Sequence, residues 1–327
     1  MEKYIEISGR KIGIDYDPVV IAEMGINPGG SLEVAKSMVD SAYEAGIEII
    51  KHQTHTPEEE EEHTRESDTF TEEEELELKL YVESKGMIFI SAPYCFTAVD
   101  RLERMNVAAY KISSSQIGNT PLVEYVASKG KPVILSAAIE DTPCLKKAIE
   151  TVKKYHDKFI IQHCTSIYPT PLDKINLTTL DELREMYPGE IVGISDHSLN
   201  NFPCYAALAL GASVVERHFT DKKDRPGVEI AWSMDKDEAK ELVSYAKSIK
   251  IMKNAPKRSK ELENKKTMVA LATSKRLIKN STLTKADIIT KLVEEEGIPS
   301  DELYTIMWKK CVRDLPEGHV IKREDIK

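Results

Sequence analysis

The stretch VVIAEMGINPGGSLEVAKSMVDSAYEAGIEIIKHQTH, Val19–His55, decides the fold class. It contains a β-branched run at Val19–Gly25, an amphipathic segment SLEVAKSMVDSAYEAG and a second apolar run at Ile47–Thr54. The amphipathic segment ends on a glycine, which is the residue that most often closes a helix. The order strand, helix, strand therefore predicts a βαβ unit with two parallel strands.

The same alternation continues to about residue 253. Further candidate strands are Met87–Pro93, Ala108–Ser114, Pro132–Ala137, Phe159–Thr165, Ile191–His197 and Ser213–Thr220. Helical patterns such as TEEEELELKLYVESKG and NNFPCYAALALG separate them. Eight strands alternating with helices predict an α/β fold of the (β/α)8 TIM-barrel type. A doubly wound open sheet fits less well, because no G-x-G-x-x-G follows the first strand.

The pattern changes after Met252, where a basic and polar connector, NAPKRSKELENKK, begins. Short strand-like runs with turn residues follow it. We therefore predict a TIM-barrel catalytic domain at 1–253, a linker at 254–266 and a small domain at 267–327. A domain of about 60 residues buries a modest core, so we expect it to lean on a larger partner.

Charge and composition limit the function. The formal net charge is −10, which argues against a nucleic-acid partner, since phosphate binding needs a basic face. No stretch approaches the roughly 20 apolar residues of a membrane span, and the N-terminus lacks the apolar core of a signal peptide. The five cysteines form no C-x-x-C pair, which suits a reducing cytoplasm.

Polar residues gather at the carboxyl ends of the candidate strands, which is the face where barrels build their active sites. They are Glu23, Lys51, Gln53, Lys111, Ser113, Ser115, His163, Thr165, Ser195, Asp196, His197, Glu216 and His218. Any one of them could be structural. So many polar groups at the same end of eight strands predict a functional site.

The strongest motif is GISDHS (Gly193–Ser198) followed by ERHFTDKKDRPG (Glu216–Gly227). Its histidines, His197 and His218, end successive strands and should lie side by side. Imidazole is a common ligand of divalent metals, and Asp196 and Glu216 are placed to orient or supplement the pair. We therefore predict a metal site at these two histidines.

A second group of residues suits an anion. Lys51, Lys111 and the run Ser113–Ser115 offer ammonium and hydroxyl donors on neighbouring strand ends, and Ser195 and the HCTS segment add more. A phosphate ester that also carries a carboxylate needs many fixed donors. Taken alone, the serine run could equally be a capped turn into the next helix.

These residues carry a family resemblance over essentially the whole chain. The segments are IAEMGIN, KHQTH, SKGMIFISAP, AYKISSS, HCTSIYPTP, GISDHSLNN, ALALGAS and ERHFTDKKDRPG. They resemble the sialic acid (N-acetylneuraminate) synthase family, which includes legionaminic and pseudaminic acid synthases. The tail resembles its small antifreeze-like (SAF, β-clip) domain.

The resemblance implies a transferase reaction. Phosphoenolpyruvate would condense with an N-acylated amino-hexose such as N-acetylmannosamine, giving a nine-carbon 2-keto sugar acid and phosphate. It implies Mn²⁺ or Mg²⁺ at His197 and His218, and a homodimer in which the small domain swaps over the partner's barrel.

The resemblance also implies roles for single residues. Residues expected at phosphoenolpyruvate are Lys111, Ser113, Ser115, Ser166, Tyr168 and Ser195, and those expected at the sugar are Glu23, Lys51, Gln53 and Glu229. We count Gln116, Thr165 and Glu216 as further substrate contacts. Glu23, beside the reacting aldehyde, is our candidate for proton handling, and with the two histidines it makes up the catalytic set.

The chain departs from the family on the sugar side. The first loop reads GINPGG, with Pro28 and Gly29 in place of a polar pair, and Gln116 stands where a carboxylate is usual. The loop after KHQTH is short and rich in glutamate, and the stretch Thr267–Ser274 lacks the family's arginine. These departures suggest an altered acceptor or a weakened enzyme.

Two other functions remain open. A related synthase could take a phosphorylated sugar, although HCTSIYPTP and the additional domain favour an unphosphorylated one. A non-catalytic ice-binding protein would need a flat, neutral face, whereas the tail is charged.

Overall fold

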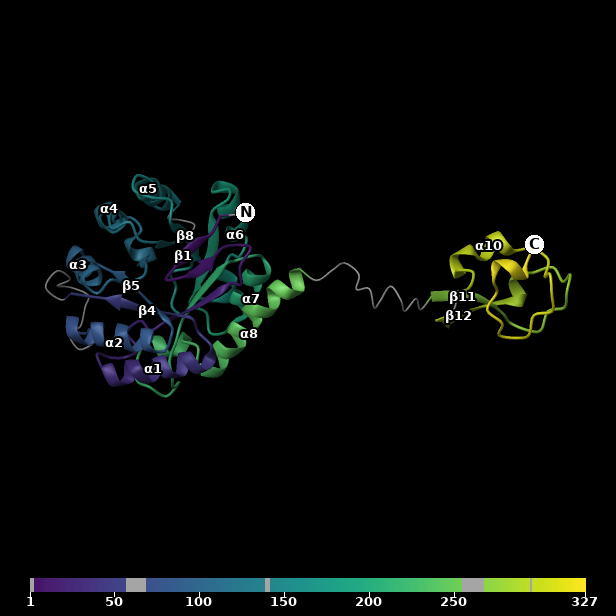
Figure 1. Cartoon of the computed structure of the whole chain (residues 1–327), viewed down its shortest axis with the longest axis horizontal. Coiled ribbons are helices and arrows are strands. Elements are labelled where there is room, and N and C mark those ends of the chain that lie inside the picture. Colours follow the sequence, from purple (N-terminus) through teal and green to yellow (C-terminus); the bar gives the residue numbers. More distant parts are fainter. Residues whose placement is uncertain (1–2, 57–68, 139–141, 255–267, 295) are drawn as a thin grey trace. The chain divides into compact units, whose positions relative to one another are not determined.

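The computed structural model describes residues 3–56, 69–138, 142–254, 268–294 and 296–327. The chain divides into two compact units, Met1–Asn254 and Ala255–Lys327 (Figure 1). Apart from Asn254, the predicted linker lies outside the described residues. The glutamate-rich loop at 57–68 lies outside them as well.

The larger unit is a closed barrel of eight parallel strands, in the order β10-β3-β4-β5-β6-β7-β8-β9. The strands are β3 (Val19–Glu23), β4 (Ile49–Thr54), β5 (Ile88–Pro93), β6 (Tyr110–Ile112), β7 (Val133–Ala137), β8 (Phe159–Cys164), β9 (Ile191–Asp196) and β10 (Val214–His218). The helices are α1 (Leu32–Ala45), α2 (Glu72–Ser84), α3 (Phe96–Arg104), α4 (Thr120–Ser128), α5 (Thr142–Lys153), α6 (Thr179–Met186), α7 (Phe202–Ala209) and α8 (Lys236–Lys253). All eight predicted strands are confirmed, and the TIM-barrel prediction with them.

The first helix shows how local sequence sets these elements. Ser31 precedes α1, and its hydroxyl accepts a hydrogen bond from the amide of Val34. Gly46 ends α1 in the left-handed region with φ +83°, a conformation that favours glycine.

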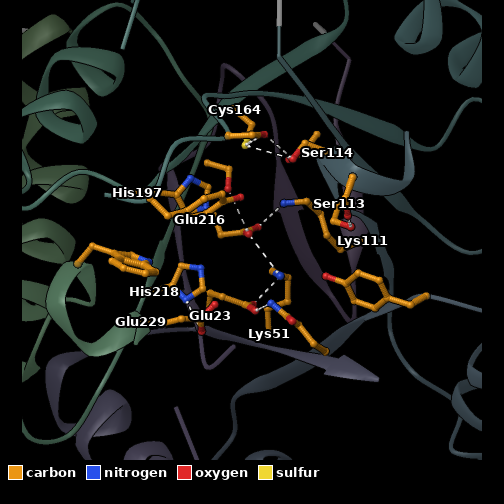
Figure 2. A pocket seen from close by; sticks show the side chains of 18 of the residues that line it. Glu23, Lys51, Lys111, Ser113, Ser114, Cys164, His197, Glu216, His218 and Glu229 are labelled. Atoms are coloured by element: carbon orange, nitrogen blue, oxygen red, sulfur yellow. Dashed lines mark hydrogen bonds and ion pairs between the residues drawn. The ribbon is translucent and has the colours of Figure 1, made fainter. Parts of the chain in front are cut away.

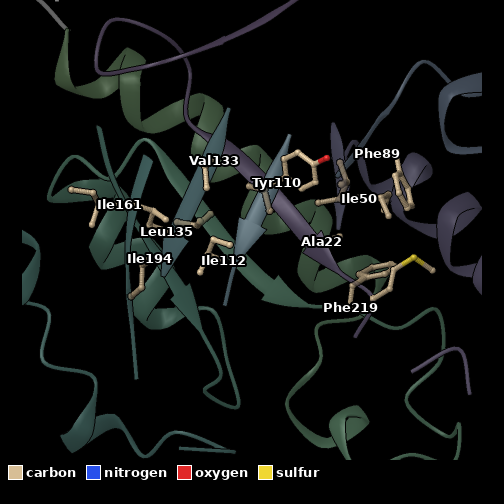
Figure 3. Close-up of a cluster of buried hydrophobic side chains, with 14 of the residues drawn as sticks. Ala22, Ile50, Phe89, Tyr110, Ile112, Val133, Leu135, Ile161, Ile194 and Phe219 are labelled. Carbon is tan, nitrogen blue, oxygen red and sulfur yellow. The ribbon is translucent and has the colours of Figure 1, made fainter. Parts of the chain in front are cut away.

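Successive residues of each strand face opposite sides of the barrel wall. Val19 and Ile21 belong to an interior cluster to which every strand or its leading residue contributes. Val20 and Ala22 belong to a larger cluster that includes residues of the surrounding helices. Figure 3 shows part of this larger cluster. This alternation decides which polar residues at the strand ends point into the barrel.

A short antiparallel hairpin, not predicted from the sequence, precedes the barrel. It pairs β1 (Ile5–Ile7) with β2 (Arg10–Ile12) through a turn at Ser8 and Gly9, both with positive φ. Ile5, Ile7 and Ile12 join the interior cluster, where they pack with the first residues of the strands. The hairpin therefore closes the amino-terminal end of the barrel.

The smaller unit pairs β11 (Met268–Thr273) antiparallel with β12 (Ile288–Val293), and carries the short helix α10 (Leu303–Ile306). It has a hydrophobic core of its own, which includes Leu271, Leu283 and Leu315. Among the helices the structure describes, none is long and apolar enough to cross a membrane.

Candidate functional site

A cavity of about 690 Å³ opens at the carboxyl ends of the barrel strands (Figure 2). Its lining residues are Glu23, Lys51, Gln53, Tyr94, Lys111, Ser113, Ser114, Ser115, Ser136, Cys164, Ser166, Tyr168, Ser195, His197, Glu216, His218, Val228, Glu229 and Trp232. They come from seven of the eight strands and from the loops that follow, with Tyr94 standing directly after the remaining strand, β5. The polar residues predicted from strand ends are thus mostly brought together.

Glu216 lies at the centre of the charged part of the cavity. Its Oε2 accepts a hydrogen bond of 2.7 Å from Nζ of Lys111, and its Oε1 lies 3.4 Å from Nζ of Lys51. Burial alone would raise the pKa of Glu216, but the two ammonium groups outweigh it and lower the pKa to about 2. Lys51 also pairs with Glu23 at 2.5 Å. Burial opposes the charge on Lys51, yet Glu216 and Glu23 raise its pKa above the ordinary value.

One wall of the cavity is made of hydroxyl groups. The hydroxyls of Ser114 and Ser166 lie 2.9 Å apart, and those of Ser113 and Ser115 lie 3.1 Å apart. They come from η2 (Ser114–Gln116) with its preceding residue, and from the loop after β8. Lys111 lines the same cavity with a buried ammonium group that donates a hydrogen bond to Glu216 (Figure 2). Such a set of donors suits a phosphate or carboxylate.

The opposite wall is rich in hydrogen-bond acceptors. The Glu23 carboxylate accepts bonds from the Gln53 amide at 2.7 Å and from the Gly25 backbone at 3.1 Å. Glu229 accepts a bond of 3.0 Å from the backbone of Ile26. A side chain at Gly25 would collide with the Glu229 carboxylate, and its φ of +52° also favours glycine. Two carboxylates held in this way can bind the hydroxyls of a sugar.

His197 and His218 lie side by side, with ring centroids 5.4 Å apart. Burial, reinforced by the field of His218, lowers the pKa of His197 to about 3, so its imidazole is neutral, as a metal ligand must be. Nδ1 of His197 is buried, with no hydrogen-bond partner among the described residues.

Glu229 orients the second histidine, since its Oε2 lies 3.2 Å from Nδ1 of His218. This contact leaves the other ring nitrogen of His218 for a metal. No group of three or more His, Cys, Asp or Glu side chains suited to a metal occurs in the part of the chain that the structure describes. The two imidazoles are the side chains that would hold a divalent ion in this cavity.

Four predicted residues are not brought into the cavity. Gln116 accepts a hydrogen bond of 2.9 Å from Asn119, and Thr165 donates to the carbonyl of Lys174 at 3.3 Å. His163 bonds the carbonyl of Ile175, and Asp196 pairs with Arg217. The strand residues among them occupy outward-facing positions. The substrate contacts of Gln116 and Thr165, and the metal support of Asp196, therefore stay predictions that this cavity does not carry. Glu216, which was also expected to support the metal, does line the cavity, and its carboxylate contacts Lys51, Lys111 and Ser195.

Five lining residues were missed by the sequence analysis. Tyr94, Ser136 and Cys164 stand an even number of residues beyond inward-facing positions of β5, β7 and β8, so counting by two along each strand would have found them. Val228 and Trp232 come from the long loop after β10, where no such period exists. The Tyr94 ring stacks on His55 at 4.3 Å.

Comparison with known proteins agrees with this picture. The NeuB family model matches residues 38–258. An uncharacterized protein of Methanocaldococcus jannaschii is 34% identical over 100% of this chain and 99% of its own length. The human N-acetylneuraminate-9-phosphate synthase is 28% identical over 97% of this chain and 94% of that protein.

A solved structure, the N-acetylneuraminic acid (sialic acid) synthetase of Leptospira borgpetersenii in complex with citrate, has a TM-score of 0.75. It is 30% identical, and the match covers 80% of this chain and 94% of that one.

A parallel eight-stranded barrel with a polar cavity at the carboxyl ends of its strands is the architecture of an enzyme. This chain belongs to the NeuB family, and its relatives include synthases of sialic, legionaminic and pseudaminic acids.

Proposed function

We propose that this chain condenses phosphoenolpyruvate with the open-chain form of an N-acylated amino-hexose. C3 of phosphoenolpyruvate would attack the aldehyde carbon and form the new C–C bond. Water would then add at C2, and phosphate would leave as the C–O bond breaks. The products are a nine-carbon 2-keto sugar acid and phosphate.

The observation that carries this proposal is the division of the cavity into two unlike walls. Lys51 and Lys111 with the serine wall suit the phosphate and carboxylate of phosphoenolpyruvate, and Ser195 and Tyr168 border the same space. Glu23, Gln53 and Glu229 suit the hydroxyls and the acylated amine of a sugar. Both reactants would then meet between Lys51 and the two histidines.

His197 and His218 would hold a divalent ion, Mn²⁺ or Mg²⁺. When bound there, it would supply Lewis-acid polarisation of the aldehyde. Glu23, whose carboxylate lies against Lys51 and Gln53, is our candidate for proton transfer at the oxygen that becomes a hydroxyl.

We further propose an unphosphorylated acceptor. Among the lining residues that the structure describes, the lysines are Lys51 and Lys111, no arginine occurs, and both lysines contact Glu216. One trianionic substrate already requires both ammonium groups, so a second phosphate would face the carboxylates of Glu23 and Glu229. The human relative is named for a 9-phosphate product, whereas the Leptospira protein is named for the free sugar acid.

The acceptor itself is N-acetylmannosamine or a close relative with altered groups. Since Gln116 is bonded to Asn119, the departures that bear on the acceptor are those in the loop of Pro28 and Gly29, in the glutamate-rich loop after KHQTH and in the small domain. Because these departures lie on the acceptor side, a relative of N-acetylmannosamine is the preferred acceptor.

An acceptor panel tests the proposal. Phosphate release from phosphoenolpyruvate would be measured with Mn²⁺ and three acceptors, namely N-acetylmannosamine, a 6-deoxy-diacetamido-hexose and N-acetylmannosamine 6-phosphate. We expect release with an unphosphorylated sugar, and its loss in His197→Ala and His218→Ala. Release with the 6-phosphate alone would overturn the acceptor class, and no release with any sugar would overturn the reaction.

We also propose that the small unit is an antifreeze-like domain that covers the cavity of a second copy in a homodimer, and that the enzyme works in the cytoplasm, where phosphoenolpyruvate is made. A monomer in light scattering at working concentration would contradict the dimer.

A further inference from the structure

A buried ion pair lies behind the two histidines, on the outer side of the barrel wall. Arg217 Nε lies 3.2 Å from Oδ2 of Asp196, and their side chains are 1% and 0% exposed. Arg217 pairs directly with Asp196 in the register of β10 and β9. Each partner immediately precedes a histidine of the cavity in sequence: Asp196 comes before His197, and Arg217 comes before His218.

The guanidinium group donates hydrogen bonds to three residues in two loops. Nη1 of Arg217 donates to Oδ1 of Asn201 at 2.5 Å, and Nη2 donates to the carbonyls of Ser198 and Trp232, the latter at 3.1 Å. Ser198 and Asn201 lie in the loop after β9, and Trp232 ends η5 (Glu229–Trp232). One side chain thus joins β10 to the loops on both sides of the histidine pair.

Asp196 completes the connection from the β9 side. Its Oδ1 accepts a bond of 3.2 Å from the Ser198 amide, and its Oδ2 accepts one of 2.8 Å from the Ser198 hydroxyl. These bonds fix the turn that contains His197. A buried ion pair is stable only where hydrogen bonds satisfy its charges. Here both carboxylate oxygens and both Nη groups make hydrogen bonds, whereas Nε has only the charge contact with Asp196.

We propose that Asp196 and Arg217 are positioning residues, which set the separation and tilt of the His197 and His218 rings for a divalent metal. The inference rests on the metal site of the proposed function. The two histidines face the cavity from adjacent strands (Figure 2), and the outward-facing pair ties those strand ends together. The bond from Arg217 to the Trp232 carbonyl also connects the pair to η5. That short helix begins at Glu229, which contacts His218.

The expected effect is on metal affinity. Residues that orient metal ligands typically change affinity by about 10–100-fold when they are replaced. Arg217→Lys keeps the charge but cannot reach three acceptors, and Asp196→Asn keeps the shape but loses the charge. We expect each to raise the Kd for Mn²⁺ at least tenfold, and to restore most of the turnover when Mn²⁺ is saturating.

The test measures Mn²⁺ binding by titration calorimetry, and the visible spectrum of the Co²⁺-loaded protein, for the full chain. Glu190→Gln is the matched control, because Glu190 is a mostly buried carboxylate that pairs with Lys153 at 3.1 Å just before β9, at the opposite end of the same strand. It should lower stability towards urea without changing the Mn²⁺ Kd or the Co²⁺ spectrum. Asn201→Ala, which removes one anchor of Arg217, serves if the other variants do not fold.

The outcomes separate the two proposals. A wild-type protein that binds neither ion would overturn the metal site, and the positioning role would fall with it. Wild-type binding with unchanged Kd and Co²⁺ spectrum in folded Arg217→Lys, Asp196→Asn and Asn201→Ala would overturn the positioning role alone. A raised Kd in these variants but not in Glu190→Gln would support it.

Discussion

Glu216 shapes the electrostatics of the cavity, because it contacts both buried lysines. With a pKa lowered to about 2, it stays ionised over the working range and keeps Lys51 charged. An arriving phosphoenolpyruvate must therefore share the ammonium groups of Lys51 and Lys111 with a resident carboxylate. This arrangement keeps two cations buried without substrate, at the expense of some binding energy when the substrate arrives.

Tyr94 offers a test of the cavity at the level of a single hydroxyl. It lines the cavity, Ser113 hydrogen-bonds its phenol, and burial raises the pKa of that phenol, so it stays protonated and can donate. We expect Tyr94→Phe to lower kcat/KM by about 3–10-fold, the usual value of one neutral hydrogen bond. Steady-state phosphate release measures this.

The matched control is Tyr125→Phe, which removes a phenol that bonds Asp100 at 2.6 Å outside the cavity. Equal losses of kcat/KM in both variants would mean that Tyr94 acts only through stability.

Much of the cavity could be predicted from the sequence, and the errors at the strand ends have one physical cause. Motif and strand-end position predicted Glu23, Lys51 and Lys111 correctly as residues that lie together. The same reasoning predicts Thr165 as a cavity residue and omits Cys164, because it counts every polar residue near a strand end without asking which side of the strand it faces. Side chains alternate with period two, so only one of two neighbours can face the interior. Fixing the parity from the buried isoleucines of each strand would have separated them.

At the scale of elements, the eight strands were predictable because each is a β-branched run between helical patterns. The β1–β2 hairpin was not predicted, since its strands have only three residues each. Such lengths carry too few alternating positions for a periodic signal. The loop after β10 has no strand period, and it supplies Glu229 and Trp232 to the cavity. The family resemblance predicted Glu229, whereas nothing in the sequence pattern predicted Trp232.

The hairpin makes a testable contribution to stability. Ile7 is fully buried against the interior cluster at the amino-terminal end, away from the cavity. We expect Ile7→Ala to lower the free energy of unfolding by about 2–5 kcal/mol, the range for a large-to-small change in a core. Urea unfolding measures this loss, and kcat of the folded fraction should not change. Ile14→Ala, at a side chain that is 57% exposed, should change stability little, and a similar loss there would argue against the closing role.

Asp325 gives the small unit a dependence on pH. Burial alone would raise its pKa, but bonds from the Lys322 amide, His319 and Arg313 lower it. Because the folded pKa lies below the unfolded one, the stabilisation is present above the ordinary aspartate pKa and is lost as pH falls below about 4.

Asp325→Asn should therefore lower the stability of the small unit at pH 7 by about 1–3 kcal/mol, and the difference from wild type should shrink in acid. Hydrogen exchange of the β11 amides at several pH values measures both effects. Asp301→Asn, at an exposed position, should leave exchange unchanged. A difference that persists unaltered at pH 3 would contradict the linkage.

At the scale of the whole molecule, the two units have separate cores. The clusters of the barrel contain residues up to Ile249, and those of the small unit begin at Met268, so no described cluster contains residues of both. Each unit therefore has the apolar burial needed to fold as its own cooperative body. The described residues that line the cavity, in turn, all belong to the barrel unit.

A chain that ends at Asn254 separates what the barrel does from what the small unit adds. Since its core and both histidines are complete, we expect it to fold and to bind Mn²⁺ with the affinity of the full chain. If the small unit covers the cavity of a second copy, the shortened chain should nevertheless lose most phosphate release, because water would enter the site and the sugar would lose a wall. Circular dichroism, calorimetry and the release assay measure the three properties. Full turnover in the shortened chain would show that the barrel alone suffices, and would leave the small unit without a part in catalysis.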